Sequence, residues 1–423
     1  MTSPTVHSNE SSAQPLVEEI PGAPSPEEAF KRLSGLPFLL FLDSAAADDD
    51  AEGCHSYLAA CPFEALRTSG RTTEILKSTG SEVENVSYEI SGREGGDPFE
   101  LLRLRLESWR APQVAGLPPF QGGAAGLFGY GLAHRIENIP RSRHDEFEVP
   151  DMVIGLYDWV LAWDHGSETC RIISHGFPAE AAQRQRRAAE RIRKVKKLLL
   201  KTTGTRAREG ESMPPLSRGE LAETWDVPEF PGMLSNFSRD DYTRAVERSI
   251  EYIRAGDIFQ VNLSQRLACP APGSPENFYL ALRKSNPAPY AGYFDLGEYV
   301  VASSSPEQFL SVEEELVTTR PIKGTCSRGY TPEEDLSRRG HLTQSGKDQA
   351  ENVMIVDLLR NDLSRVCRPH SVEVPHLFEI ERHPTVYHLV SEISGQLRED
   401  RDAIDLLRAA FPGGSITGAP KVR

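Results

Sequence analysis

The sequence predicts an α+β fold, in which strands and helices are mixed rather than regularly alternating. Short apolar segments typical of strands occur along most of the chain, and amphipathic helix patterns fall between them without a strand–helix–strand rhythm. The chain has 423 residues, 39% of them hydrophobic and 26% charged, which is the composition of an ordinary globular protein. This length is enough for one large domain or for two to three average ones.

The charge of the chain argues against some classes of partner. The net charge is −15, whereas surfaces that bind nucleic acids or anionic membranes are positively charged. The apolar runs fall short of the ~20 residues that cross a bilayer, and the first residues lack the pattern of a signal peptide. The six cysteines are scattered without a C-x-x-C pair, which favours reduced thiols. We therefore expect a cytoplasmic protein with no nucleic-acid or membrane partner.

Composition also suggests how the chain is divided. Residues 1–26 are rich in Ser, Pro, Glu and Thr, so we expect a disordered tail. The stretch 203–233 is rich in Pro and Gly, as in a linker or a long surface excursion. These features predict an N-terminal half over 27–230 and a second part over 231–423.

The N-terminal half is predicted to consist mainly of strands, at 36–43, 55–60, 151–163 and 169–174. The segment 151–163 is almost continuously apolar, which is typical of a strand buried on both faces. The basic stretch 184–201 is expected to form a helix with a solvated face.

The second part contains clearer helix signals. Ser238, with Asp241 three residues later, is a capping pattern, and Gly256 is well placed to end the helix. The apolar stripe of this helix consists of Tyr242, Val246, Ile250 and Ile253. Ser345 and Asp348 repeat the capping pattern before a second helix. Strands are predicted at 258–263, 299–303, 316–319 and 385–397, and the second helix at 349–366.

Lys323 and Glu307 are the first candidates for chemistry. Lys323 lies between an apolar residue and a glycine, and Glu307 follows a Ser-Ser-Ser-Pro turn. A buried amine near a carboxylate is suited to covalent attack with acid–base assistance. Taken alone, however, Lys323 is more typical of an ordinary surface residue, and Glu307 of a capping or surface residue.

Three further features also have two interpretations each. The glycine-rich segment 413–418 precedes a possible helix start, so it is either a plain turn or a holder of a carboxylate or phosphate. Glu351 is either a charge favoured at a helix start or a Mg²⁺ ligand. His388 is either a hydrogen-bonded core residue or a catalytic one.

In order and spacing, these segments resemble the chorismate-utilising enzymes, a family that includes anthranilate, aminodeoxychorismate, isochorismate and salicylate synthases. The matching runs are 256–262, 305–307, 321–325, 350–362, 388–391 and 412–423. Weaker likenesses reach back to about residue 30. The resemblance implies two packed antiparallel sheets flanked by helices, with the site between them, and it implies that residues 231–423 form the core that binds chorismate there.

The resemblance also implies roles for individual residues. Lys323 and Glu307 would be catalytic, and Glu351 would hold a Mg²⁺ ion that neutralises a carboxylate of the substrate. The residues expected to bind chorismate are Gln260, Thr325, His388, Gly413, Gly414, Thr417, Gly418 and Lys421.

Two positions choose among the members of the family. Water-adding members resemble this chain but have a lysine where it has Gln260, and a neutral amide cannot activate water. Anthranilate synthases carry Pro-Ile-Ala-Gly-Thr where this chain has Lys323, whereas aminodeoxychorismate synthases carry the lysine. We therefore expect amination of chorismate at C4, giving 4-amino-4-deoxychorismate for 4-aminobenzoate and folate synthesis. Lys323 must be neutral to attack, and burial or the neighbouring Arg320 would favour that form.

The ammonia is expected to come from a separate glutamine amidotransferase, because the chain has no Gly-x-Cys-x-Gly nucleophile turn. Family members continue beyond the glycine-rich segment, with a second Mg²⁺-binding Glu and a substrate-binding Arg, so a fragment or an inactive chain is also expected. The alternatives are anthranilate synthase component I and a non-catalytic chorismate- or tryptophan-binding subunit.

Overall fold

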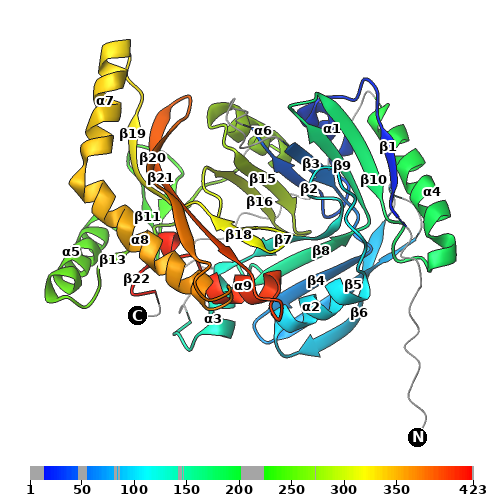
Figure 1. Ribbon diagram of the computed structural model, residues 1–423, viewed down its shortest axis with the longest axis horizontal. Helices are drawn as coiled ribbons and strands as arrows, with labels where there is room; N and C mark the ends of the chain where they lie inside the picture. The colour runs from blue at the N-terminus through cyan, green and yellow to red at the C-terminus, as the bar shows by residue number, and fades with distance from the viewer. Residues whose placement is uncertain are drawn as a thin grey trace, which may run out of the picture. The chain divides into compact units, whose positions relative to one another are not determined.

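The computed structural model describes residues 14–45, 55–80, 83, 86–141, 145, 147–201, 223–271 and 273–421, which form the ribbon of Figure 1. The chain divides into two compact units. Unit 1 is drawn from Met1–Gly129, Val149–Glu211 and Gly273–Ser304. Unit 2 is drawn from Tyr130–Glu148, Ser212–Pro272 and Ser305–Arg423.

These units correct two sequence predictions. The segment predicted as a tail over 1–26 is ordered at its end, because β1 (Leu16–Glu19) pairs antiparallel with β10 (Thr169–Ser174). The boundary predicted between 230 and 231 is crossed in both directions, since the segment Gly273–Ser304 belongs to unit 1 and Tyr130–Glu148 to unit 2. Residues 1–13 and most of the predicted linker lie outside the described residues.

Unit 1 contains two sheets. The seven-stranded sheet has the spatial order β1, β10, β9 (Trp159–Asp164), β3 (His55–Ala59), β2 (Leu40–Asp43), β15 (Tyr290–Asp295) and β16 (Val300–Ser305). The antiparallel five-stranded sheet has the order β6 (Ser87–Gly95), β5 (Thr72–Thr79), β4 (Glu64–Ser69), β8 (Met152–Tyr157) and β7 (Gly123–Phe128). Pairing of β15 with β2 is what brings the segment after residue 273 into this unit.

The two sheets of unit 1 pack on each other through one buried apolar cluster. Leu40 and Val160 come from the seven-stranded sheet, and Ala65 and Val153 come from the five-stranded sheet. Aligned packing of two sheets buries one face of each, so their inward residues form a common core. The predicted α+β class with two packed antiparallel sheets is confirmed.

The segment predicted as one strand over 151–163 is in fact two strands that belong to different sheets. β8 lies in the five-stranded sheet and β9 in the seven-stranded sheet, and Asp158 separates them. Asp158 is fully buried, and its carboxylate lies 3.5 Å from the Arg191 guanidinium. Both strands are buried on both faces, as the continuous apolar pattern predicted.

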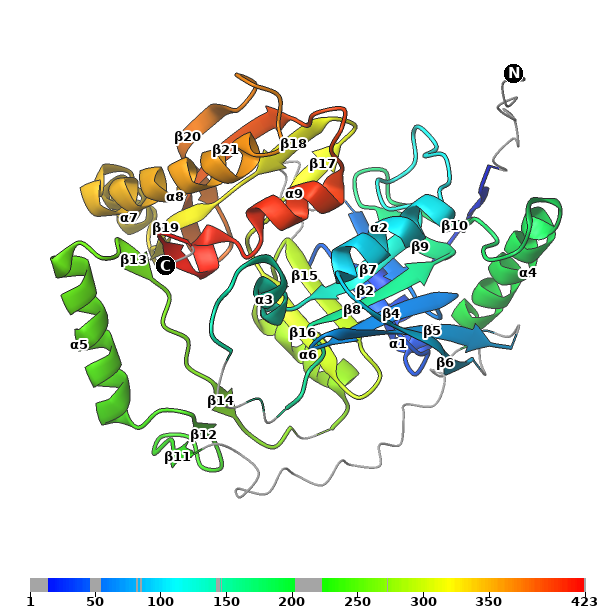
Figure 2. The same cartoon turned by 90° about the horizontal axis from the view of Figure 1, so that it is seen from below.

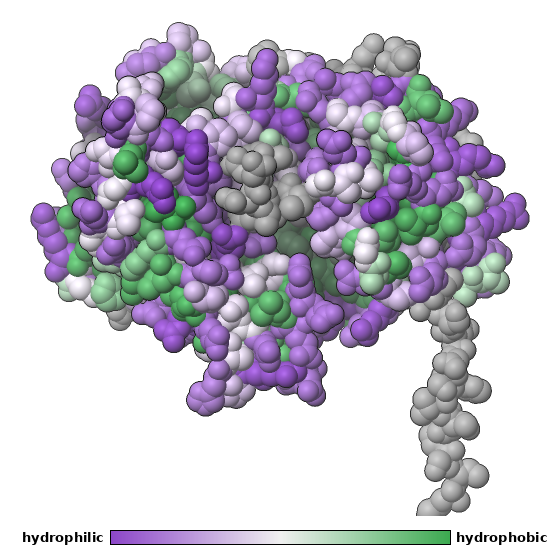
Figure 3. Space-filling view, turned by 45° about the horizontal axis from the view of Figure 1, so that its top comes forward, coloured by the Kyte–Doolittle hydropathy of each residue, from purple (hydrophilic) through white to green (hydrophobic). Residues whose placement is uncertain are grey.

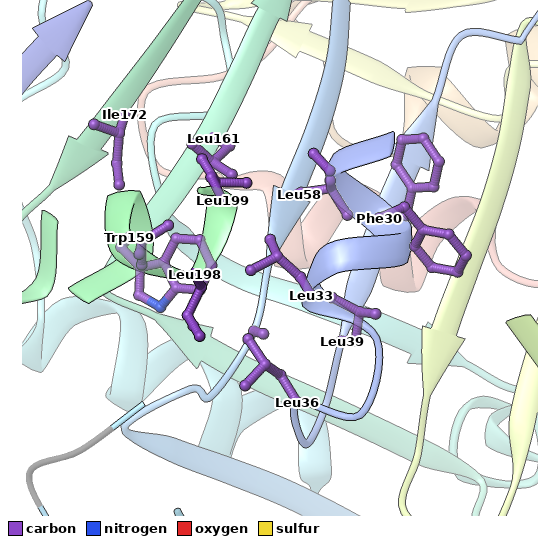
Figure 4. Close-up of a cluster of buried hydrophobic side chains, with 14 of the residues drawn as sticks. Phe30, Leu33, Leu36, Leu39, Leu58, Trp159, Leu161, Ile172, Leu198 and Leu199 are labelled. Atoms are coloured by element: carbon purple, nitrogen blue, oxygen red, sulfur yellow. The ribbon is translucent and has the colours of Figure 1, made fainter. Parts of the chain in front are cut away.

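Helices cover the outer face of the seven-stranded sheet. They are α1 (Pro26–Leu33), α4 (Ala181–Leu199), the helix predicted from the basic stretch, and α6 (Pro275–Ser285). Figure 4 shows Phe30 and Leu33 of α1 and Leu198 of α4 on the same cluster as Trp159 and Leu161 of β9. Because side chains alternate along a strand, Val160 between them faces the other sheet. Another helix of unit 1 is α2 (Pro98–Ser108).

Unit 2 is built around one five-stranded sheet with β21 (Val386–Gln396) at its centre. One side of β21 pairs with β20 (Glu373–Arg382), and the other side pairs with β18 (Leu316–Thr319) and β19 (Ile322–Ser327) in succession. β17 (Ser311–Glu313) pairs with β18. The helices α7 (Pro332–Gln344), α8 (Gly346–Ser364) and α9 (Ala403–Ala410) pack in this unit, and α8 lies along the sheet in Figures 1 and 2.

Shorter elements complete unit 2. β13 (Gln260–Val261) pairs with β22 (Gly418–Ala419), next to the 3₁₀ turn η2 (Gly414–Ile416). A small sheet joins β11 (Trp225–Asp226), β12 (Leu234–Ser235) and β14 (Leu267–Ala268). The segment Tyr130–Glu148 contributes the 3₁₀ turn η1 (Tyr130–Leu132) and α3 (Ala133–Ile136).

The first predicted helix of the second part is α5 (Arg239–Ala255), and its ends are as predicted. The Ser238 side chain accepts a hydrogen bond from the Asp241 N–H, and Gly256 ends the helix with φ 79°. The predicted apolar stripe, however, contains no buried residue in this helix, all of which is described. Ile250 and Ile253 are 40% and 43% exposed. Local sequence therefore defined the helix, whereas its apolar face did not indicate burial.

Hydrophilic side chains cover most of the face drawn in Figure 3, and hydrophobic residues are scattered among them. Within the described part of the chain, no helix combines the length and the apolar character needed to cross a membrane.

Candidate active site

The predicted site residues all belong to unit 2, where they come from six places in the sequence. They lie on β13 (Gln260), before β17 (Glu307), on β19 and β21 (Lys323, Thr325 and His388), on α8 (Glu351) and in the C-terminal segment (Gly413, Gly414, Thr417, Gly418 and Lys421).

A β-bulge places Lys323. Ile322 pairs with Val390 and Thr325 with His388, so Lys323 and Gly324 together oppose a single residue of β21. Gly324 has φ 95°, and a Cβ there would lie 3.0 Å from the Asp348 side chain of α8. Such a backbone favours glycine at the second bulge position. The Lys323 amine donates a hydrogen bond to the Ser415 carbonyl at 3.2 Å.

Glu307 lies beside Lys323 because of a hydrogen bond to the same strand. Its Oε1 accepts from the Ile322 N–H at 3.4 Å, and its own N–H donates to the Ser305 hydroxyl at 3.3 Å. Burial raises the pKa of the Glu307 carboxyl above its usual value, and this rise is opposed by Ser415, by the Ile322 N–H and by the Lys323 charge. The structure thus brings a carboxyl with increased proton affinity to the predicted nucleophile.

The glycine-rich segment packs closely on its neighbours. A Cβ on Gly414 would lie 2.2 Å from Leu358 of α8, and Gly413 lies against the Phe309 ring. Gly418 has φ 149°, and a Cβ there would lie 2.4 Å from the Gln260 carbonyl oxygen. The helix start predicted for this segment is instead the 3₁₀ turn η2 followed by β22. Its close packing on α8 and β13 fixes where its backbone groups lie.

Gln260 and Thr417 are held by the backbone around this segment. Gln260 pairs with Ala419, and its side-chain amide donates to the Asn262 side chain at 3.2 Å. The Thr417 hydroxyl donates to the Gly413 carbonyl at 3.1 Å. Asn262 also contacts the segment, yet sequence reasoning gave it no role. The only available signal was its place two residues after Gln260 in a run that matches the family.

Thr325 and His388 form a pair across β19 and β21. The Thr325 hydroxyl and His388 Nδ1 are 2.8 Å apart, and the His383 ring stands edge-on to His388 at 4.9 Å. Burial, and to a lesser extent the charge of His383, lowers the pKa of His388 to about 4, and Glu381 opposes the shift. The imidazole is therefore neutral near pH 7, so it offers one N–H donor and one acceptor nitrogen.

Lys421 is bound by other groups of the protein. Its amine donates to the Asp362 carboxylate at 2.7 Å and to the Ala410 carbonyl at 2.8 Å. This ion pair is almost fully buried. Lys421 therefore ties the end of the glycine-rich segment to α8 and α9, while its predicted contact with substrate stays a prediction.

Arg320, which was expected to favour neutral Lys323, is itself paired. Its guanidinium contacts the Glu381 carboxylate and lies 3.7 Å from Glu392.

Glu351 could contribute to a Mg²⁺ site but not form one alone. It lies 3.7 Å from Lys347, and its side chain is 42% exposed. Glu351 and Leu358 are two helical turns apart on one side of α8, and Leu358 contacts Gly414. Among the described residues, no three His, Cys, Asp or Glu side chains gather as a metal site. Mg²⁺ often takes one or two protein carboxylates with substrate and water oxygens, so Glu351 fits as one ligand.

Comparison with known proteins identifies the family of the chain. The family model described as "chorismate binding enzyme" matches residues 64–423. Aminodeoxychorismate synthase component 1 of Escherichia coli K12 is 38% identical over 401 residues, covering 93% of this chain and 78% of that protein. Anthranilate synthase component 1 of Acetivibrio thermocellus is 35% identical over 400 residues, covering 94% and 77%. The crystal structure of anthranilate synthase component I from Streptococcus pneumoniae TIGR4 matches with a TM-score of 0.67 at 27% identity, over 89% of this chain and 76% of that one. The chain belongs to the family of chorismate binding enzymes.

Proposed function

We propose that the chain is component 1 of an aminodeoxychorismate synthase, a transferase that aminates chorismate at C4. The product, 4-amino-4-deoxychorismate, leads to 4-aminobenzoate and folate. The observation that carries the proposal is the position of Lys323, on a glycine-dependent bulge beside the raised-pKa carboxyl of Glu307. Relatives with the same name, at 37–38% identity over most of the chain, support it.

The proposed chemistry has two substitutions. Neutral Lys323 forms a bond to C2 of the ring, the two ring double bonds shift, and the C4–oxygen bond breaks while Glu307 protonates the departing hydroxyl to give water. Ammonia then forms a bond to C4, the double bonds shift back, and the C2–nitrogen bond to Lys323 breaks. Glu307 takes the proton from the incoming amine, and two substitutions restore the original configuration at C4.

Other residues of the site would bind and orient chorismate. The backbone N–H groups of the glycine-rich segment, together with neutral His388 and the hydroxyl of Thr325, suit the hydrogen-bonding groups of a dicarboxylate. Gln260 stands where water-adding relatives use a lysine as a general base, and its neutral amide cannot activate water. A Mg²⁺ ion bound in part by Glu351 would neutralise one substrate carboxylate.

The ammonia is proposed to come from a glutamine amidotransferase partner in the cytoplasm. The relatives are named as component 1, which implies a second component. A purified chain that used glutamine without a partner would contradict this part of the proposal.

Anthranilate synthase component 1 is the second candidate, because relatives of that name are up to 38% identical to the chain. That reaction adds ammonia directly at C2. It needs no lysine at position 323. The bulge-held Lys323 therefore disfavours it.

The test is to incubate the purified chain with chorismate, Mg²⁺ and ammonium chloride and to identify the product by chromatography and mass spectrometry. Aminodeoxychorismate supports the proposal, fluorescent anthranilate supports the second candidate, and binding without turnover supports a non-catalytic subunit. Lys323→Ala should abolish aminodeoxychorismate formation, and Lys197→Ala, at an exposed position on α4, is the matched lysine control. Full aminodeoxychorismate formation by Lys323→Ala would exclude the covalent mechanism.

A further inference from the structure

We propose that Asn262 is a positioning residue for the Lys323 amine, acting through the Ser415 carbonyl. This inference rests on the proposed function, because it assigns a role within that reaction. It is carried by hydrogen bonds that link three segments far apart in the sequence.

The Ser415 carbonyl is shared by two donors. The Lys323 amine donates to it at 3.2 Å, and the Asn262 side-chain amide donates to it at 2.6 Å. A flexible four-carbon lysine side chain loses its aim when its hydrogen-bond acceptor moves. Whatever fixes this carbonyl therefore fixes the direction of the amine.

Asn262 is bound to the glycine-rich segment at a second point. Its backbone N–H donates to the Thr417 carbonyl at 2.8 Å. The two contacts fall on the middle of η2, at Ser415, and on Thr417 just after its end, so Asn262 holds the C-terminal half of the turn that presents the Ser415 carbonyl. Figure 2 shows β13, which ends just before Asn262, beside the C-terminal segment, whose β22 pairs with it.

The Asn262 side chain is in turn oriented by Gln260. The Gln260 amide donates to Asn262 Oδ1, which directs the N–H₂ group of Asn262 toward Ser415. An aspartate at position 262 has the same shape but no N–H to donate. It would repel the Ser415 carbonyl oxygen, and its negative charge would favour the protonated form of the nearby amine.

Two variants test the inference in the full chain, with chorismate and ammonium chloride as substrates. Asn262→Ala should lower kcat about 10- to 100-fold with KM for chorismate within about twofold, because misplacing a reacting group affects turnover more than binding. Asn262→Asp should lower kcat at least as much and move the rise of kcat with pH to higher pH. Asn236→Ala is the matched control, since Asn236 also bonds a backbone group, the Arg266 N–H at 2.8 Å, away from the glycine-rich segment.

The outcomes separate this inference from the proposed function. A wild-type chain that makes no aminodeoxychorismate refutes the proposed function and, with it, the inference. A wild-type chain that is active alongside variants with unchanged kcat and pH profile refutes the inference alone. A rise in KM with unchanged kcat also refutes it, because Asn262 would then serve substrate binding. Thermal unfolding of each variant shows whether it is folded. If Asn262→Ala does not fold, the kinetics of the isosteric Asn262→Asp variant test the inference.

Discussion

Acid should destabilise the folded chain through His388. Burial and the charge of His383 lower the pKa of His388 from its usual 6.5 to about 4 in the folded state. The unfolded chain therefore binds a proton at this side chain at a higher pH than the folded chain does. The stability that neutral His388 contributes is complete above about pH 6.5 and is lost as the pH falls toward 4. At 1.36 kcal/mol per pKa unit, the loss amounts to about 3 kcal/mol.

The shift depends on groups from several strands. His388 is only 8% exposed, and its Nδ1 is paired with the Thr325 hydroxyl. His383 disfavours the imidazolium, whereas the Glu381 carboxylate favours it. Desolvation is the largest cause, so the acid sensitivity should persist at high salt, which screens only the charges.

Urea unfolding of the wild type and of His388→Asn at pH 7 and at pH 4 measures this loss. The other titrating groups are common to both proteins, so the wild type should lose about 3 kcal/mol more of its unfolding free energy than the variant. His370→Asn, at an exposed position of φ 63° that asparagine tolerates, should behave as the wild type does. Equal losses in the wild type and His388→Asn would refute the reasoning.

Three further predictions concern the site. Glu307→Gln removes the proposed general acid and should lower kcat about 10²- to 10⁴-fold, and unchanged turnover would contradict that role. A carboxyl with a raised pKa costs the folded state stability as the pH rises through that pKa, so urea unfolding near pH 7 should show the variant to be as stable as the wild type or more stable. Gly418→Ala places a Cβ 2.4 Å from the Gln260 carbonyl, so both kcat and unfolding free energy should fall, the latter by about 1–3 kcal/mol; a fully active variant would show that β13 and β22 need not pair. Lys421→Met leaves the buried Asp362 carboxylate unpaired and should cost about 3–5 kcal/mol in urea unfolding, which the double variant with Asp362→Leu should largely restore.

Helix ends could be predicted from the sequence, because capping is local. Ser238 and Gly256 bound α5, and Ser345 caps α8 through the Asp348 N–H, as their spacing indicated. The burial of α5 could not be predicted in the same way. An apolar stripe shows which face of a helix can be buried, but burial depends on what the rest of the chain places against it.

The seven-stranded sheet shows the same limit. The apolar run over 151–163 correctly predicted burial on both faces, but periodicity carries no information about which sheet a strand joins. The chain changes sheet at Asp158, whose carboxylate is balanced by Arg191 of α4. A charged residue inside an apolar run was the available signal, and its partner lies too far along the sequence to be identified from spacing.

For the site, the sequence identified residue types but not their contacts. The proximity of Glu307 and Lys323 depends on the Ile322 N–H, a backbone group that no pattern of side chains reveals. Asn262 contacts two backbone carbonyls of the glycine-rich segment, and Lys421 has a buried acidic partner instead of a free amine. These contacts depend on how segments far apart in the sequence pack together, and no local sequence pattern predicts that packing.

Glu307 and Lys323 lie near each other, but each side chain bonds to the backbone rather than to the other, and this arrangement has a chemical reason. A direct ion pair would stabilise carboxylate and ammonium, which are the wrong forms for a proton donor and a nucleophile. In the described structure each group bonds to a neutral backbone partner instead: Lys323 to the Ser415 carbonyl, and Glu307 to the Ile322 N–H. Burial then favours the uncharged form of the Glu307 carboxyl, whose pKa it raises. The bulge and the glycine-rich segment thus keep the two side chains close enough to act on one substrate without neutralising each other.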